Sequence, residues 1–330
     1  MTYLTGESSV IHDWTKIDFV NFVYNSFQFN GVLGGPTLVV NGSTIVKIVG
    51  VNMQCIIDEN TTSIDEDLIL LGNPKTKFTG SFSNVASDIY TSKYSFNFDS
   101  TLLDNLEGSD SGAGAIGNLL GSLSVSLWTK HDHTATLPTD GYIFDRANSP
   151  TTQGYSMLLD GFSLGEWAFF IGTNGGTRRI RATTPVTVPE DVWFHIVGTW
   201  NTDTKSQKIY INGELINENL WPGETIQSCT QKTVMGCKTP VATNPYHGII
   251  NNISLWDKEL TQSEIDEIFN SGEPNNLDLH SAKNNGVSWW KMGDGATWDG
   301  TSWRVEDLWG GTHVVSANML YGNRVIDSPE

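Results

Sequence analysis

Residues 121–130, G-S-L-S-V-S-L-W-T-K, alternate apolar and polar side chains. Leu123, Val125 and Leu127 would share one face of an extended chain, and the intervening serines would share the other. A period of two residues is typical of a strand with one buried face. The stretch therefore predicts a half-buried β-strand, and we expect the surrounding chain to supply the rest of its sheet.

Other segments extend this β pattern. Residues 192–200, V-W-F-H-I-V-G-T-W, are apolar on both faces and predict a central strand. Asn212-Gly213 lies between I-Y-I and E-L-I, and Asn-Gly favours the positive φ angles of a type I′ hairpin turn. A second Asn-Gly signal occurs in residues 37–49, T-L-V-V-N-G-S-T-I-V-K-I-V. Short strands punctuated by turn residues indicate a sandwich or barrel.

One short helix is expected after Leu260, in T-Q-S-E-I-D-E-I-F-N-S-G. Thr261 and Glu264 have the spacing of a capping box, and Leu260 could pack on Ile265 as a hydrophobic staple. Gly272 would end the helix in the left-handed conformation. The apolar side of this helix should lie against the sheets.

Composition excludes several protein classes. The 330 residues carry 19 Lys+Arg and 37 Asp+Glu, a formal net charge of −18, which is opposite to the basic surface that nucleic-acid binding needs. The N-terminus has no signal-peptide pattern, and no stretch reaches the ~18 apolar residues of a membrane span. We therefore expect neither nucleic-acid binding, secretion nor membrane insertion.

The cysteines indicate a reducing compartment. Cys55, Cys229 and Cys237 are odd in number, so at most one pair can form, and Cys229 with Cys237 could close a loop. Free buried thiols in a cytoplasm are the preferred interpretation.

Changes in composition suggest three parts. Residues 1–89 predict a small N-terminal β domain for anchoring or oligomerisation, and residues 90–280 predict the main β domain. Residues 281–330 form a Trp-rich extension expected to pack on the main domain or on an interface.

The middle of the chain resembles the laminin-G-like jelly rolls of the concanavalin A-like lectin/glucanase superfamily. Seven segments carry the resemblance in order: Y-S-F-N-F-D (94–99), L-S-V-S-L-W-T-K (123–130), Y-I-F-D-R (142–146), Y-S-M-L-L-D (155–160), V-P-E-D-V-W-F-H-I-V-G-T-W (188–200), K-I-Y-I-N-G-E (208–214) and G-I-I-N-N-I-S-L-W-D-K-E-L-T-Q-S-E-I (248–265). The resemblance implies an all-β fold: an antiparallel jelly-roll sandwich closed by one short helix, plus the small N-terminal β domain.

The resemblance also implies a calcium site. Many members hold a structural Ca²⁺ between an acidic residue of the first strand and the penultimate strand, and the matching positions here are Asp99, Asn251 and Asn252. Asparagine in place of the expected acidic residue removes charge, which weakens such a site.

A second resemblance directs the functional hypothesis. A jelly roll whose closing helix runs into residues 270–295, with N-S-G-E-P-N-N-L-D-L-H-S and V-S-W-W-K-M-G-D-G, is similar to virion proteins of tailed, particularly marine, bacteriophages. It implies a non-enzymatic capsid decoration or fibre/tail component, made in the host cytoplasm without a signal peptide. Such a protein would be homo-oligomeric and would contact other virion proteins. The alternatives are a lectin or adhesin for host-surface glycans and, second, a glycoside hydrolase.

The tail tryptophans are the candidate ligand-binding residues, namely Trp289, Trp290, Trp298 and Trp303. They could stack on sugar rings, pack on the sandwich or anchor a subunit interface, and packing or an interface is preferred.

Apparent catalytic motifs lack the context they need. The G-x-G-x-x-G match at 112–117 precedes a strand, and the G-x-S-x-G match around Ser163 precedes the apolar strand E-W-A-F-F-I-G, so both predict loops or hairpins. The E-x-D-x-x-E pattern of the glucanases is absent from the strands, although a carboxylate pair could still converge from distant strands. His131 and His133, with Asp132 or Asp140, could bind a metal, but polar loop residues are preferred. No enzyme activity is expected.

Overall fold

The computed structural model divides the chain into two compact units, Met1–Ile89 and Tyr90–Glu330. In the first unit it describes seven strands. In the second it describes residues 92–329 except 113–114, 116, 133–139, 149–151, 162–164, 183–187, 190 and 239–242. The unit that the prediction of a jelly roll concerns is therefore described almost throughout.

The first unit contains two small sheets, one with strand order β1-β6-β7 and one with order β2-β3-β4-β5. The strands are β1 (Thr2–Leu4), β2 (Ile11–Asp13), β3 (Asn21–Val23), β4 (Thr37–Val40), β5 (Thr44–Lys47), β6 (Leu68–Leu70) and β7 (Thr76–Phe78). Strands β4 and β5 pair antiparallel with Val40 opposite Thr44, which confirms the hairpin predicted in residues 37–49. Cys55 lies outside the described residues.

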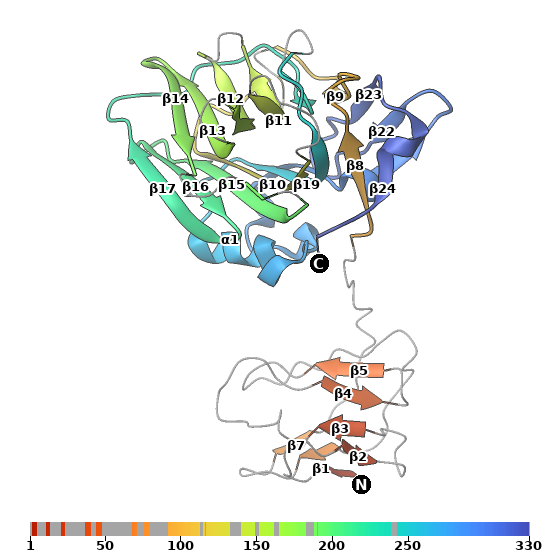
Figure 1. The fold of residues 1–330 in the computed structure, drawn as a ribbon. Helices are drawn as coiled ribbons and strands as arrows, with labels where there is room; N and C mark the ends of the chain where they lie inside the picture. The colour runs from red at the N-terminus through yellow and green to blue at the C-terminus, as the bar shows by residue number, and fades with distance from the viewer. Residues whose placement is uncertain are drawn as a thin grey trace. The chain divides into compact units, whose positions relative to one another are not determined.

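The second unit is a sandwich of two large sheets (Figure 1). The eight-stranded sheet has the order β17 (Glu214–Leu220), β16 (Ser206–Ile211), β15 (Trp193–Trp200), β10 (Leu123–His131), β19 (Gly248–Trp256), β8 (Tyr94–Phe98) and β24 (Arg324–Ile326), with β20 (Gly286–Trp290) also paired to β19. The nine-stranded sheet has the order β14 (Gly176–Arg181), β13 (Glu166–Thr173), β12 (Gly154–Asp160), β11 (Gly141–Ala147), β18 (Val234–Met235), β9 (Asn105–Gly108), β23 (Val314–Ala317), β22 (Trp303–Val305) and β21 (Ala296–Trp298). The strands within both sheets pair antiparallel, so the predicted all-β jelly-roll sandwich is confirmed.

The main core lies between these sheets. Leu123, Val125 and Leu127 of β10 contribute to it from one side, and Met157 and Phe169 of the other sheet contribute from the opposite side. A Cβ atom on Gly198 of β15 would lie 2.3 Å from the Phe169 ring, so this position has room only for glycine. The β16–β17 turn has φ angles of 50° at Asn212 and 82° at Gly213, which confirms the hairpin predicted at Asn212-Gly213.

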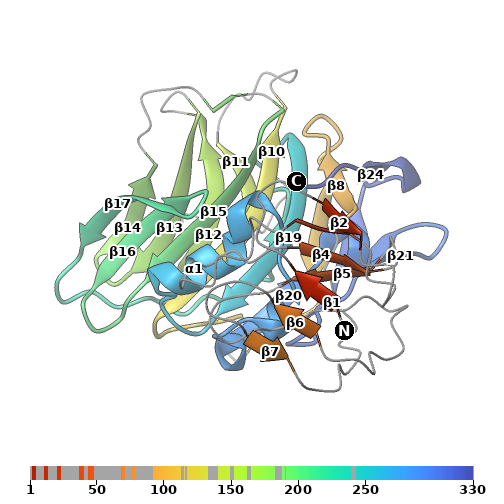
Figure 2. The ribbon, with the colours of Figure 1, turned by 90° about the horizontal axis from the view of Figure 1, so that it is seen from below.

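The predicted helix covers the outer face of the eight-stranded sheet. Helix α1 (Gln262–Phe269) lies across the strands of this sheet (Figure 2). It begins after Thr261, whose capping box with Glu264 is present. The Phe269 ring stacks on Trp128 of β10 at 5.8 Å. The helix ends at Asn270, which has the left-handed conformation with a φ of 45°, so the predicted stop at Gly272 was two residues late.

Because α1 packs on the outer face of β10, the prediction that this strand is half-buried was wrong. Ser124 and Ser126 on its outer face are buried as completely as the leucines on its inner face. Ser124 Oγ donates to the Lys258 carbonyl oxygen, and Ser126 Oγ is 2.8 Å from His195 Nε2. The alternation was real, but α1 and its flanking segments cover the polar face.

The Trp-rich tail contributes to both sheets. Strands β20 and β24 join the eight-stranded sheet, and β21 to β23 join the nine-stranded sheet. Five short 3-10 helices lie between α1 and the C-terminus: η3 (Asn270–Gly272), η4 (Leu277–Leu279), η5 (Lys283–Asn285), η6 (Met292–Gly295) and η7 (Tyr321–Asn323). In the described part of the chain, no helix is long and apolar enough to cross a membrane.

Candidate functional site

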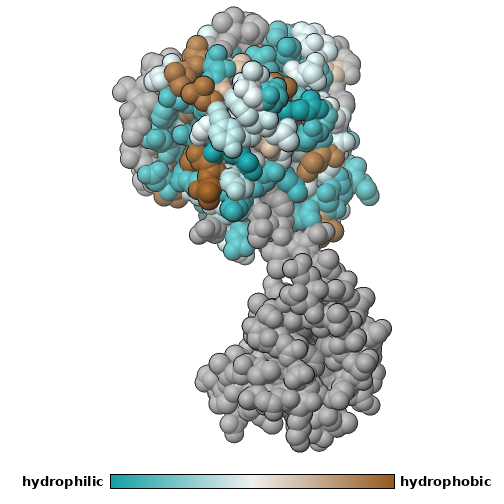
Figure 3. Space-filling view, turned by 90° about the vertical axis from the view of Figure 1, so that its right-hand side faces the viewer, coloured by the Kyte–Doolittle hydropathy of each residue, from teal (hydrophilic) through white to brown (hydrophobic). Residues whose placement is uncertain are grey.

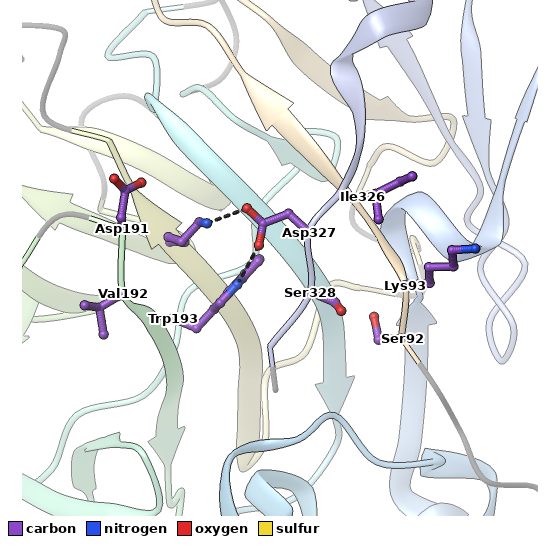
Figure 4. A pocket seen from close by; sticks show the side chains of 9 residues that line it. Ser92, Lys93, Asp191, Val192, Trp193, Ile326, Asp327 and Ser328 are labelled. Carbon is purple, nitrogen blue, oxygen red and sulfur yellow. Dashed lines mark hydrogen bonds and ion pairs between the residues drawn. The ribbon is translucent and has the colours of Figure 1, made fainter.

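A cavity of about 710 Å³ opens on the outer face of the eight-stranded sheet (Figure 4). Side chains alternate along a strand, so Lys130 points to the same face as Trp128, the face on which α1 packs. The cavity is lined by Ser92, Lys93, Lys130, Asp191, Val192, Trp193, Ile326, Asp327 and Ser328. We call it the Trp193 pocket. Its size is within the range of small-molecule sites.

Three strands build the centre of the Trp193 pocket. Lys130 of β10 is directly opposite Trp193 of β15 in the ladder, and the Lys130 ammonium lies 5.7 Å from the Trp193 ring. Asp327 follows β24, and its carboxylate accepts a hydrogen bond of 3.0 Å from Trp193 Nε1 and forms an ion pair with Lys130. The indole is therefore held in one orientation by a lysine and a carboxylate.

Charges of both signs flank this centre. Asp191 lies at one end of the Trp193 pocket and Lys93 at the other (Figure 4). The two lysines that line the pocket balance its two aspartates. A partly exposed indole surrounded by a few fixed polar groups can hold a ligand that has both apolar and hydroxyl-bearing surfaces.

The predicted calcium residues do not meet. Strand β8 pairs with β19 so that Phe98 is opposite Gly248, which places Asp99 beyond the end of that pairing. Asn251 contacts Ser95 instead, four residues from Asp99 and about 13 Å along the strand. The Asp99 carboxylate accepts hydrogen bonds from the backbone and hydroxyl of Thr101, which lower its pKa.

The two asparagines are also occupied. Asn252 donates to the Asn251 side-chain oxygen, and the Asn252 oxygen accepts a 3.1 Å bond from Trp289 Nε1. Their oxygens thus face protein donors, and the three residues do not fit a shared calcium ion. The described residues also contain no group of three or more His, Cys, Asp or Glu side chains arranged to hold a metal.

Three of the four candidate tryptophans are buried. Trp289 packs on Trp309 beneath the segment after α1, and Trp290 and Trp303 lie in the main core. Their indole nitrogens are all bonded within the protein, those of Trp290 and Trp303 to the carbonyl oxygens of Thr312 and Leu320. A buried ring offers no face to a ligand, so these three have a packing role. Only Trp298 is partly exposed.

The nine-stranded sheet brings together a carboxylate pair that sequence reasoning did not identify. Asp160 is fully buried and accepts hydrogen bonds from Arg179 at 2.6 Å and Arg181 at 2.5 Å, and the Asp140 carboxylate lies 3.7 Å from the same Arg179 guanidinium. Burial and the neighbouring charge of Asp160 raise the pKa of Asp140 to about 6, and the arginines keep the pKa of Asp160 low. Asp160 therefore ionises at a lower pH than Asp140.

This pair differs from a glycoside-hydrolase pair. Retaining and inverting enzymes separate their carboxyl groups by about 5 Å or more so that a sugar bond or a water fits between them. Asp160 is instead fully buried and paired with two arginines, one of which also lies 3.7 Å from Asp140. The arrangement is an ion-pair network, in which Arg179 also lies 4.0 Å from the centre of the Phe170 ring.

Replacing Asp140 by asparagine should remove a loss of stability that wild type undergoes between acid and neutral pH. The folded state holds the Asp140 proton up to about pH 6, whereas an unfolded aspartate loses it near 3.8, so this group's contribution falls as pH rises between those values. In D140N that loss is absent. Urea unfolding at pH 4 and 7.5 should show the variant gaining about 1 to 3 kcal/mol over wild type between the two pH values. A stability difference between the two proteins that is the same at both pH values would contradict the raised pKa of Asp140.

The other candidate motifs have structural roles where they are described. His131 is buried, and its Nδ1 lies 2.9 Å from the His247 carbonyl oxygen, while His133 lies outside the described residues. The two glycine motifs lie between strands as predicted, at β9–β10 and in the β12–β13 hairpin, although Ser163 itself is not described. Cys229 and Cys237 are free and buried, and burial raises the pKa of the Cys237 thiol to about 12.

Comparison with known proteins supports the fold. Residues 108–266 match the family model of the concanavalin A-like lectin/glucanases superfamily. No curated protein matches the chain. A candidate carbohydrate binding protein from Bacteroides ovatus ATCC 8483 is similar in structure, with a TM-score of 0.51 and 14% identity over 77% of this chain and 68% of that one.

Two further solved structures are less similar. The heptameric SAP-like pentraxin of Limulus polyphemus has a TM-score of 0.44 and 16% identity, covering 68% of this chain and 94% of its own. The Ruminococcus gnavus IT-sialidase CBM40 bound to α2,3-sialyllactose has a TM-score of 0.39 and 13% identity, covering 48% of this chain and 91% of its own. At these identities, the likeness to the Bacteroides protein concerns the fold.

Proposed function

We propose that the Tyr90–Glu330 unit is a non-catalytic carbohydrate-binding domain and that the Trp193 pocket is its binding site. The observation that carries the proposal is the indole of Trp193, fixed by Lys130 and Asp327 at the wall of an open cavity. A sugar presents a flat apolar C–H face and a rim of hydroxyl groups. The ring would stack on the indole, and its hydroxyls would bond to Asp191 and Lys93.

The lectin-like fold supports this proposal. The matched superfamily model and the Bacteroides ovatus structure, a candidate carbohydrate binding protein, share the sandwich with this chain. The pairing of Asp160 with two arginines favours binding over hydrolysis, because a fully buried carboxylate engaged in this way is not open to a sugar bond. The virion role and the homo-oligomer remain predictions from the sequence.

A glycan array probed with the full chain tests the proposal. We expect saturable binding to a subset of glycans and no release of reducing ends from the matching polysaccharide. Failure of the wild-type chain to bind any neutral or acidic glycan would overturn the proposal.

Glycan binding should also survive removal of calcium. Asp99, Asn251 and Asn252 do not converge, and none of them lines the Trp193 pocket. Repeating the array in excess EDTA should therefore leave the signals within about twofold. Loss of all signals in EDTA, restored by added Ca²⁺, would show that binding depends on a calcium site and not on the Trp193 pocket alone.

A further inference from the structure

A second aromatic surface lies at the turn after β23, in the 3-10 helix η7. The Tyr321 ring stacks on Trp303, with ring centres 5.5 Å apart and an angle of 17° between the planes. Trp298 meets Tyr321 edge-on at 5.9 Å. Trp303 is buried, whereas Tyr321 is 65% exposed, so one face of the tyrosine rests on the core and the other faces solvent.

The turn that carries Tyr321 is held firmly. Asn323 accepts a 2.6 Å hydrogen bond from the Leu320 backbone and donates to Asp104 and to the Asn97 carbonyl oxygen. Trp303 Nε1 donates to the Leu320 carbonyl oxygen at 2.9 Å. An exposed ring on a turn fixed in this way loses little conformational entropy when it binds a ligand.

The surface around this turn is mixed. The side of the second unit that carries β22 to β24 shows separate apolar patches within a mostly hydrophilic surface (Figure 3). Leu320 is as exposed as Tyr321, at 65%. An open aromatic face in such surroundings suits a planar ligand with a polar rim more than a large apolar partner.

Charge selects the class of ligand. Exposed aromatic rings stack on nucleobases as well as on sugars. A polyanion would approach a chain with a formal net charge of −18, and the Arg324 guanidinium near this turn is already engaged by the Tyr94 ring and the Gly293 carbonyl oxygen. A neutral sugar ring meets no such barrier.

We propose that Tyr321, flanked by Trp298, is a second subsite that takes a neutral saccharide ring. The inference rests on the proposed function, since it assumes that the chain binds carbohydrate. Tyr321 and Asp327 are separated by six residues, so their Cα atoms are at most about 20 Å apart, with β24 between them. A polymeric glycan can therefore engage both subsites and bind more tightly than a single sugar.

Affinity electrophoresis of the full chain in gels containing mannan, galactan, β-glucan or alginate tests the subsite. Y321A should weaken retardation in a neutral-polysaccharide gel about tenfold, and Y321F, which keeps the ring, should stay within twofold of wild type. L320A is the matched control, because it removes an equally exposed apolar side chain from the same turn and should have little effect. Circular dichroism confirms that each variant is folded.

The outcomes separate the two proposals. If W193A loses retardation in the gel and Y321A does not, the second subsite is overturned and the Trp193 pocket remains supported as the binding site. Retardation by alginate alone overturns the neutral ligand class but leaves carbohydrate binding. Absence of retardation of wild type in every gel overturns both.

Discussion

Alanine in place of Trp193 is expected to weaken glycan binding by about 10- to 100-fold. Stacking of a nucleobase on an aromatic side chain contributes about 1 to 3 kcal/mol, and we take the same scale for a sugar ring packed on the indole; each 1.4 kcal/mol is a factor of ten in affinity. The substitution also removes the indole N–H that orients Asp327, and leaves the Lys130 ammonium without an aromatic neighbour. Titration calorimetry with a glycan identified on the array measures the change.

Trp221 offers a matched control for this substitution. Its indole likewise lies near a cation, the Arg178 guanidinium at 4.6 Å, and its Nε1 donates to a side-chain oxygen, that of Gln207. It follows β17 at the other edge of the sheet and does not line the Trp193 pocket. W221A should therefore keep wild-type affinity. An equal loss in W221A and W193A would mean that general damage to the domain, and not the Trp193 pocket, explains the effect.

The second large effect is a loss of stability in acid that depends on His195. This residue of β15 is fully buried and packs beside the Trp128 and Phe269 rings, and burial lowers its pKa to about 3. Its Nε2 lies 2.8 Å from Ser126 Oγ, and its buried Nδ1 has no hydrogen-bond partner. Protonation would place an uncompensated charge beneath α1.

The direction of the effect follows from linkage. Above pH 6.5 the imidazole is neutral in both states; below it, only the unfolded chain takes up the proton. The free energy of unfolding should therefore fall by about 1.4 kcal/mol per pH unit between 6.5 and 3, or up to about 5 kcal/mol in total.

Urea unfolding measures this contribution. Tryptophan fluorescence reports on the sandwich, because eleven of the twelve tryptophans lie beyond residue 90. H195Q cannot take up a proton, so between pH 7 and pH 4.5 it should lose about 3 kcal/mol less than wild type does. The comparison uses only the change in unfolding free energy between the two pH values, since the glutamine can itself alter stability at every pH. Parallel pH profiles for the two proteins would contradict the assignment to His195.

Local patterns predicted much of the second unit. The turn at Asn212-Gly213 and the cap at Thr261 depend on neighbouring residues alone, and both are present as predicted. The burial of Ser126 could not be predicted, because it depends on a helix 140 residues further along the chain that covers the strand. The start of helix α1 was predicted correctly from its capping box, whereas its end was placed two residues too late.

The candidate site was harder to predict because it depends on register. Lys130 and Trp193 stand in the quoted strand motifs, but only the pairing of β10 with β15 makes them neighbours. Asp327 reaches them through β24, a strand of three residues without a clear sequence signal. Three of the four tryptophans predicted as ligand-binding residues are buried in the sandwich. The exposed Tyr321 was not predicted as a ligand-binding residue.

The most direct test of carbohydrate binding at the Trp193 pocket is a nuclear magnetic resonance titration. The full chain, labelled with ¹⁵N at its indoles, is titrated with a glycan from the array, and W193F identifies the Trp193 signal. If glycans bind in the Trp193 pocket, the Trp193 indole signal should shift progressively and saturate, because its N–H lies beside Asp327 at the wall of the cavity. Saturable glycan binding that leaves this signal unchanged would contradict it.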